Sequence, residues 1–209
     1  MWTAMTTGAR RGELCAIRLH SVDLDEGRET LWLRRAIRKE HGRLVEAELK
    51  THQQRRVALD AETAEILREY IQRARSRSAS LDLDLLTDAF LFSGSPDNST
   101  FAIPDSVTQR YDRLAARLGI ATTFHRLRHY SATELIAAGV DPRTVAGRLG
   151  HGGGGTTTLK TYSAWVSEAD QRAAKNLGAR MPGAHGPLRC ERGRRVPGPT
   201  AGRHKTWSS

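Results

Sequence analysis

Hydrophobic positions along the first sixty residues follow two different spacings. Residues 1–17 keep a helical spacing, so we expect them to form the end of a helix that carries Arg10. Three short apolar runs follow, with polar turns at 41–42 and 50–54 between them: 30–33, 44–49 and 55–59. Apolar runs of this length bounded by polar turns are typical of strands. The pattern predicts a small antiparallel sheet with hairpin loops.

From Asp60 onward the apolar spacing is that of helices. Asp60 can cap a helix that runs to about Arg77, with one apolar face made of Ile66, Leu67, Tyr70, Ile71 and Ala74. Further helices are expected from Asp105 or Ser106 to Gly119 (stripe Val107, Tyr111, Leu114, Leu118), from about His125 to Ala138, from Pro142 to Gly150, from Thr156 through Tyr162, and over 166–177. The predicted fold class is mainly α with a small antiparallel β-sheet.

The composition favours a polyanionic partner. The chain of 209 residues has 33 Lys and Arg against 23 Asp and Glu, a formal charge of +10. A basic surface of this size is typical of nucleic-acid binding, although arginine-rich coding contributes, since only five of the basic residues are lysine. Residues 183–209 hold six basic side chains, one acid and eight Gly or Pro, so we expect a disordered tail there.

The sequence gives little sign of a disulfide-bonded, membrane-spanning or metal-binding protein. The two cysteines, Cys15 and Cys190, form no CxxC pair, which fits a reducing cytoplasm. No apolar run reaches membrane-spanning length, and no signal peptide opens the chain. His125 and His129 have the spacing of a zinc helix, but position 126 is Arg where a Glu is needed, so we expect neither a metal nor another cofactor.

Two distant segments carry side chains that suit phosphodiester chemistry without a metal. The first is T-G-A-R-R-G-E-L at residues 7–14, and the second holds H-R-L-R-H at 125–129, L-G-H at 149–151 and Tyr162. Guanidinium groups bind phosphate oxygens in a two-pronged manner. A phenol has a pKa of about 10 and needs cationic neighbours to become a nucleophile. The combination predicts cleavage of a phosphodiester by a tyrosine held among arginines.

These motifs resemble those of the tyrosine recombinase (phage integrase) family over most of residues 1–180. The resemblance implies the catalytic-domain fold of that family and site-specific DNA recombination through a 3′-phosphotyrosine intermediate, in a protein from a mobile element. It implies catalytic roles for Arg10, Lys50, His125, Arg128, His151 and Tyr162. Tyr162 would be the nucleophile and Lys50, on a hairpin, the general acid, while Glu13 would support Arg10.

The chain departs from the family pattern at two places. Four glycines after His151 lengthen the interval to Tyr162, and only nine residues precede Arg10. We therefore expect residues 1–182 to be a catalytic domain without its front helices, followed by the tail at 183–209. Such a chain is expected to bind double-stranded DNA weakly on its own, whereas the full-length form would act as a homo-tetramer on DNA.

Two alternatives share much of this pattern. A type IB topoisomerase uses the same nucleophile and arginine logic, and would relax DNA without a specific site. A non-catalytic, DNA-binding remnant of an integrase would keep the fold but not the chemistry. Replacing Tyr162 with Phe separates catalysis from binding.

Overall fold

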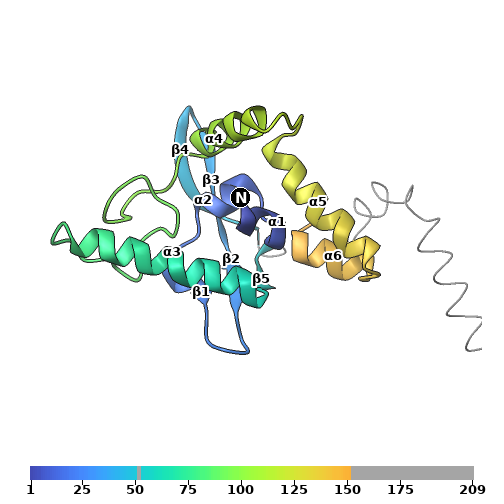
Figure 1. The fold of residues 1–209 in the computed structure, drawn as a ribbon, viewed down its shortest axis with the longest axis horizontal. Coiled ribbons are helices and arrows are strands. Elements are labelled where there is room, and N and C mark those ends of the chain that lie inside the picture. Colours follow the sequence, from blue (N-terminus) through green and yellow to red (C-terminus); the bar gives the residue numbers. More distant parts are fainter. Residues whose placement is uncertain (51–52, 152–209) are drawn as a thin grey trace, which may run out of the picture. The chain divides into compact units, whose positions relative to one another are not determined.

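A computed structural model describes residues 1–50 and 53–151. Its elements, shown in Figure 1, are α1 (Trp2–Thr7), α2 (Arg11–Cys15), the 3-10 turn η1 (Leu19–Ser21), β1 (Val22–Asp23), β2 (Thr30–Leu33), β3 (Arg35–Glu40), β4 (Arg43–Glu48), β5 (Arg55–Ala58), α3 (Ala61–Ala79), α4 (Pro104–Arg117), α5 (Phe124–Ala137) and α6 (Pro142–Leu149). The predicted fold class, mainly α with a small antiparallel sheet, is confirmed. The helices expected after His151 and the boundary at 182 lie outside the described residues.

The first segment is two short helices, so the prediction of one helix through Arg10 was wrong. Gly8 ends α1 in the left-handed conformation (φ 63°), and its N–H donates to the carbonyl of Ala4. A side chain at Gly8 would meet Leu149, since a Cβ there would lie 2.4 Å from Leu149 Cδ2. Glycine is therefore required by both the backbone turn and the close approach of α6. Arg10 follows as the N-cap of α2.

The strands do not form the single sheet of runs 30–33, 44–49 and 55–59 that the sequence predicted. β2 pairs with β1 and β5, while β4 pairs with β3, a charged strand that the apolar pattern did not predict. His41 and Gly42 join β3 to β4 with positive φ at both positions, 47° and 81°. That backbone is the two-residue turn preferred in hairpins. The predicted turn at 41–42 is thus confirmed, but it connects β4 to β3.

The helices after the sheet largely follow the predicted caps. The Asp60 carboxylate accepts from the Thr63 N–H at the start of α3, and the Asp141 carboxylate accepts from the Thr144 N–H at the start of α6. Helix α4 differs, because it begins with Pro104 at its first position and has no side-chain cap. Leu118, predicted in its apolar stripe, lies just past the helix end and is exposed.

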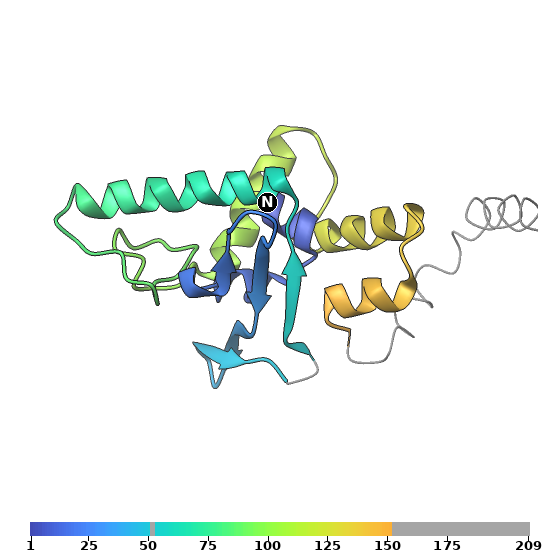
Figure 2. The same ribbon diagram turned by 90° about the horizontal axis from the view of Figure 1, so that it is seen from below.

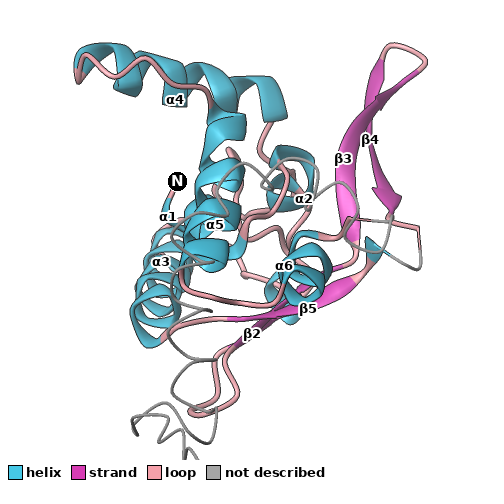
Figure 3. Cartoon of the chain, turned by 90° about the vertical axis from the view of Figure 1, so that its right-hand side faces the viewer, coloured by secondary structure: helices cyan, strands magenta, loops and turns pink. Residues whose placement is uncertain are grey.

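The main core lies between the three-stranded sheet and the helices. It is built from β2, β5, α3, α4 and α5 side chains, among them Leu31, Leu33, Val57, Leu67, Tyr111, Phe124 and Leu127. Helix α5 contacts α1 and α6, and α6 contacts β5, as the two views in Figures 1 and 2 show. The β3–β4 hairpin extends away from β2 and β5 (Figure 3). Within the described residues, no helix has both the length and the apolar character needed to cross a membrane.

Candidate active site

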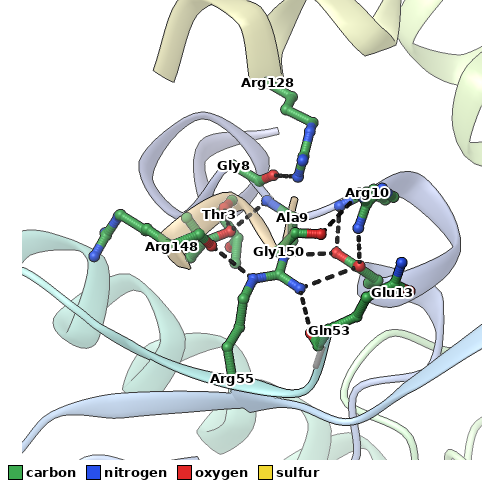
Figure 4. Close-up of polar contacts among 11 residues, drawn as sticks. Thr3, Gly8, Ala9, Arg10, Glu13, Gln53, Arg55, Arg128, Arg148 and Gly150 are labelled. Carbon is green, nitrogen blue, oxygen red and sulfur yellow. Dashed lines mark hydrogen bonds and ion pairs between the residues drawn. The ribbon is translucent and has the colours of Figure 1, made fainter. Parts of the chain in front are cut away.

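Four segments that are far apart in the sequence meet around Arg10 and Glu13 (Figure 4). They are the turn between α1 and α2, the start of β5, the first turns of α5 and the end of α6. We call Arg10, Glu13, Arg55, Arg128 and His151 the arginine cluster. The cluster brings together both predicted phosphate-binding arginines and one of the predicted histidines.

Arg10 is held by contacts at three atoms. Its backbone N–H donates to Glu13 Oε2 at 2.8 Å, and its Nη1 donates to Glu13 Oε1 at 2.8 Å. Its Nη2 donates to the carbonyl of Gly150 at 3.1 Å. The Glu13 side chain therefore fixes Arg10, as the sequence predicted, and the guanidinium also connects α2 to the end of α6.

Glu13 is buried, with a side chain 1% exposed, and it pairs with a second arginine. Arg55 Nη2 lies 2.8 Å from Glu13 Oε2, and Arg55 Nη1 donates to Oε1 at 3.2 Å. Burial by itself would raise the pKa of Glu13, but the hydrogen bonds and charges of Arg55 and Arg10 lower it below its ordinary value. Glu13 is therefore a carboxylate shared between two guanidinium groups.

Arg128 is buried in the first half of α5, where it donates from Nη1 to the carbonyl of Gly8. His125 lies one helical turn earlier, on the same side of α5, as predicted from the spacing. Arg10, Arg128 and His125 line one open pocket of about 320 Å³, together with Ala9, Arg11, Thr108, Thr123 and Phe124. The pocket therefore offers the guanidinium groups of Arg10 and Arg128 and the His125 imidazole to an anion, while Arg11, also in its lining, is paired with Asp105.

His151 directly follows the glycine that ends α6. Gly150 adopts the left-handed conformation (φ 70°), and the His151 N–H donates to the carbonyl of Ala146 at 3.0 Å. Burial and the charges of Arg128, Arg10 and Arg55 lower the pKa of His151 to about 4. The imidazole is therefore neutral at pH 7 and lies within the electrostatic reach of all three arginines.

His125 and His129 form a pair on α5, with ring centroids 4.8 Å apart and planes at 85°. The pKa of His125 is lowered, mainly by partial burial and to a smaller extent by the charges of His129, Arg128 and Arg10. Both predicted site histidines are thus disposed to be neutral hydrogen-bonding groups. Across residues 1–50 and 53–151, no group of three His, Cys, Asp or Glu side chains is placed to hold a metal ion.

Lys50 lies at the connection between β4 and β5, with an exposed side chain. Its carbonyl accepts from the Gln53 N–H at 2.7 Å, which places Lys50 close to the residues that precede β5. Tyr162, the predicted nucleophile, lies outside the described residues. The structure thus groups Arg10, Arg128, His125 and His151, and places Lys50 between β4 and β5.

Arg55 is the residue that the sequence analysis missed, because it was taken only as part of a strand. A signal was available in the strand alternation. Val57 is buried, so Arg55, two residues earlier, faces inward, while Arg56 between them faces outward. An arginine at an inward position requires a buried partner, and here that partner is Glu13.

Comparison with known proteins agrees with this geometry. The sequence model described as the phage integrase family matches residues 1–166. The tyrosine recombinase XerC of Halalkalibacterium halodurans is 30% identical over 163 residues, which cover 77% of this chain and 48% of that protein. The chain therefore spans about half the length of this curated relative.

Two solved structures share the fold. One is the Tn1549 transposon integrase in complex with transposon right-end DNA, with a TM-score of 0.67 and 22% identity over 85% of this chain and 57% of that one. The other is the XerA recombinase, with a TM-score of 0.57 and 24% identity over 86% of this chain and 56% of that one. Because the family model matches most of the sequence and these structures share its fold, the chain belongs to the phage integrase family of tyrosine recombinases.

Proposed function

We propose that this chain is the catalytic region of a site-specific recombinase that breaks and rejoins double-stranded DNA through a tyrosine. The observation that carries the proposal is the grouping of Arg10, Arg128, His125 and His151, three of them around one pocket. Two arginines and two neutral imidazoles can bind the oxygens of a single phosphodiester. The similarity to a transposon integrase supports an origin in a mobile element.

The phosphate would be bound before any bond breaks. Arg10 and Arg128 carry fixed positive charge, which offsets the charge that builds on the phosphorus oxygens in the transition state. A neutral imidazole at His125 or His151 can donate its N–H to the same oxygens. The negative phosphate would raise the pKa of both rings, so binding would strengthen their donor character.

Tyr162 is proposed as the nucleophile. Its phenolic oxygen would attack phosphorus, forming a 3′-phosphotyrosine ester and breaking the bond from phosphorus to the 5′ oxygen. The phenol would pass its proton to water as the ester forms, helped by the nearby positive charge, and the 5′ oxygen would take a proton from Lys50, the proposed donor. The ester conserves the energy of the broken bond, so a second DNA 5′-hydroxyl can reverse the step without ATP.

The test is capture of the covalent intermediate. The protein is incubated with a pool of nicked duplexes of randomised sequence, in which the short 5′-hydroxyl fragment diffuses away after cleavage. DNA that stays bound to protein in SDS is then sequenced. We expect an adduct with the wild-type chain, none with Tyr162→Phe and an unchanged yield with Tyr130→Phe, an exposed tyrosine of α5. DNA affinity should be the same in all three.

Each other result points to a definite alternative. Binding without any adduct would show a non-catalytic DNA-binding remnant and would overturn the proposal of catalysis. Adducts spread over all sequences, with relaxation of supercoiled DNA, would indicate topoisomerase-like cleavage. Adducts confined to related sequences support a site-specific recombinase.

We further propose that the full-length protein acts in the cytoplasm as a homo-tetramer on paired DNA sites. Exchange of strands between two duplexes requires four cleavages, and each active site described above supplies one. Cross-linking on DNA that carries the sequences captured above should trap a species of four chains. A protein that rejoins strands as a monomer or dimer would contradict the proposal.

A further inference from the structure

We propose that Arg55 is a positioning residue that holds Arg10 and His151 in place for phosphate binding, without itself contacting the DNA. The inference rests on the proposed function, because it concerns the residues that would bind the scissile phosphate. Arg55 was absent from the predicted site, and its side chain is only 7% exposed. A side chain that is so enclosed acts through its neighbours.

Arg55 contacts each segment that forms the arginine cluster except α5 (Figure 4). It pairs with Glu13 on α2, its Nε donates to the carbonyl of Arg148 at 2.6 Å, and its Nη1 donates to the carbonyl of Gln53 at 3.1 Å. Glu13 in turn holds Arg10. One guanidinium group therefore connects α2, the end of α6 and Gln53, just before β5.

The end of α6 closes directly over this guanidinium. A Cβ at Gly150 would lie 2.5 Å from Arg55 Nη1 and 2.9 Å from its Cζ, so any side chain at this position would displace the guanidinium. The carbonyl of the same glycine accepts from Arg10 Nη2. Gly150 thus lies between Arg55 and Arg10, and the next residue is His151. Moving Arg55 would shift the peptide that sets the place of the His151 ring.

Lysine cannot replace these contacts. The five N–H groups of Arg55 lie in a plane and reach Glu13, Arg148 and Gln53 in different directions at once, whereas an ammonium group is a single point of charge. Arg55→Lys keeps the charge but loses the geometry. It therefore separates a role in positioning from a role in simple charge balance.

The first measurement is the titration of His151 by NMR in the full chain. The groups whose charge acts on its ring are Arg128, Arg10, Arg55 and His129, and all stay present or keep their charge in Arg55→Lys. We expect the His151 pKa to rise from about 4 by about one unit in Arg55→Lys, because the ring leaves its partly buried position. Arg56→Lys, on the outward face of β5, is the matched control and should leave the titration unchanged.

The second measurement compares two DNA substrates in the adduct assay. In one, sulfur replaces the 5′ oxygen of the cleaved bond, so the leaving group needs no proton. Lys50→Ala should lose activity on ordinary DNA and regain it with sulfur. Arg55→Lys should form adduct at least tenfold more slowly on both substrates, since it disturbs the phosphate-binding groups and not the proton donor.

The outcomes separate this inference from the proposed function. No adduct with wild-type protein overturns the function, while the His151 titration still decides the role of Arg55. A folded Arg55→Lys protein with an unmoved His151 pKa, or one rescued by sulfur, overturns the inference. Should Arg55→Lys fail to fold, Glu13→Asp, which draws the carboxylate away from Arg55, is titrated instead, and the same rise is required.

Discussion

Two clusters in this molecule pair one glutamate with two arginines, and they differ in burial. Glu13 lies between Arg10 and Arg55 with a side chain 1% exposed. Glu46, on β4, lies between Arg18 and Arg35 with a side chain 16% exposed. The Arg18 guanidinium also packs over the Phe90 ring at 4.0 Å. Both carboxylates have lowered pKa values, because the arginines outweigh the effect of burial.

The difference shows what the same chemistry does in two settings. The Glu46 cluster fastens the β3–β4 hairpin to the segment before η1, and water reaches part of it. In the Glu13 cluster the carboxylate and Arg55 are buried, and the contacts join helices and a strand that are up to 140 residues apart in sequence. A buried ion pair adds little net stability over apolar packing, but it fixes the geometry of its members. That property suits groups that must bind a phosphate.

The largest expected effect is the loss of the buried carboxylate. Glu13→Gln leaves Arg55 buried without its counter-charge, which costs about 3–5 kcal/mol of the free energy of unfolding. Glu46→Gln, the matched change in the partly exposed cluster, is expected to cost about 1 kcal/mol or less. Urea denaturation of both variants measures the difference. Equal losses would show that burial does not distinguish the two clusters.

A smaller loss of stability is expected when a glycine near each cluster is replaced: Gly8, before the Glu13 cluster, and Gly42, in the hairpin that carries Glu46. Gly8 and Gly42 both have positive φ, 63° and 81°. Alanine in this conformation costs about 1 kcal/mol at either position. Gly8→Ala also drives a Cβ against Leu149, which adds about 1–3 kcal/mol, while Gly42 has open space around it. The melting temperature of Gly8→Ala should therefore be well below that of Gly42→Ala. The reverse order would refute the packing of Leu149 against Gly8.

The smallest effect is a dependence of stability on pH. His151 has a pKa of about 4 in the folded protein against an ordinary value of 6.5. The unfolded chain thus takes up the proton first, so this stability is present above pH 6.5 and is lost as pH falls toward 4. A shift of this size corresponds to about 3 kcal/mol, and solvent screening of the partly exposed ring reduces it to about 1 kcal/mol.

The carboxylates of Glu13 and Glu46 affect stability in a different pH range from His151. The lowered pKa values of Glu13 and Glu46 affect stability only as pH falls below 4.5. Urea denaturation of the wild-type chain and His151→Asn at pH 7, 6 and 5 isolates the histidine. The variant should lose less stability between pH 7 and 5. An identical loss would mean that the His151 ring is not held among the arginines.

The sequence predicted the individual helices and turns of the fold better than the way they pair and pack. Caps such as Asp60 and Asp141 and the turn at 41–42 are local signals, because the residues that form them are neighbours. The charged strand β3 gave no apolar alternation, so its pairing with β4 was missed. The break at Gly8 was missed although a glycine that ends a helix is a local signal, whereas the close approach of Leu149 lies far along the chain and could not be predicted.

The same limit applies to the site. Arg10, His125, Arg128 and His151 stand out through their motifs, and the spacing of His125 and Arg128 sets their common side of α5. Arg55 stands in no such motif, and its importance depends on a contact with Glu13 across 42 residues. The alternation of β5 can show that Arg55 faces inward, but not which carboxylate it meets.

The arginine cluster holds three guanidinium groups, those of Arg10, Arg55 and Arg128, but only one carboxylate, Glu13, which pairs with the first two. His151, whose pKa is lowered to about 4, lies beside them. A cluster with this excess of positive charge repels itself, and a bound dianion or a DNA phosphate would relieve the repulsion. Any oxyanion that binds there must then raise the melting temperature of the protein, by the linkage between binding and folding. The scissile phosphate would therefore act as a counter-ion that completes the fold before it acts as a substrate.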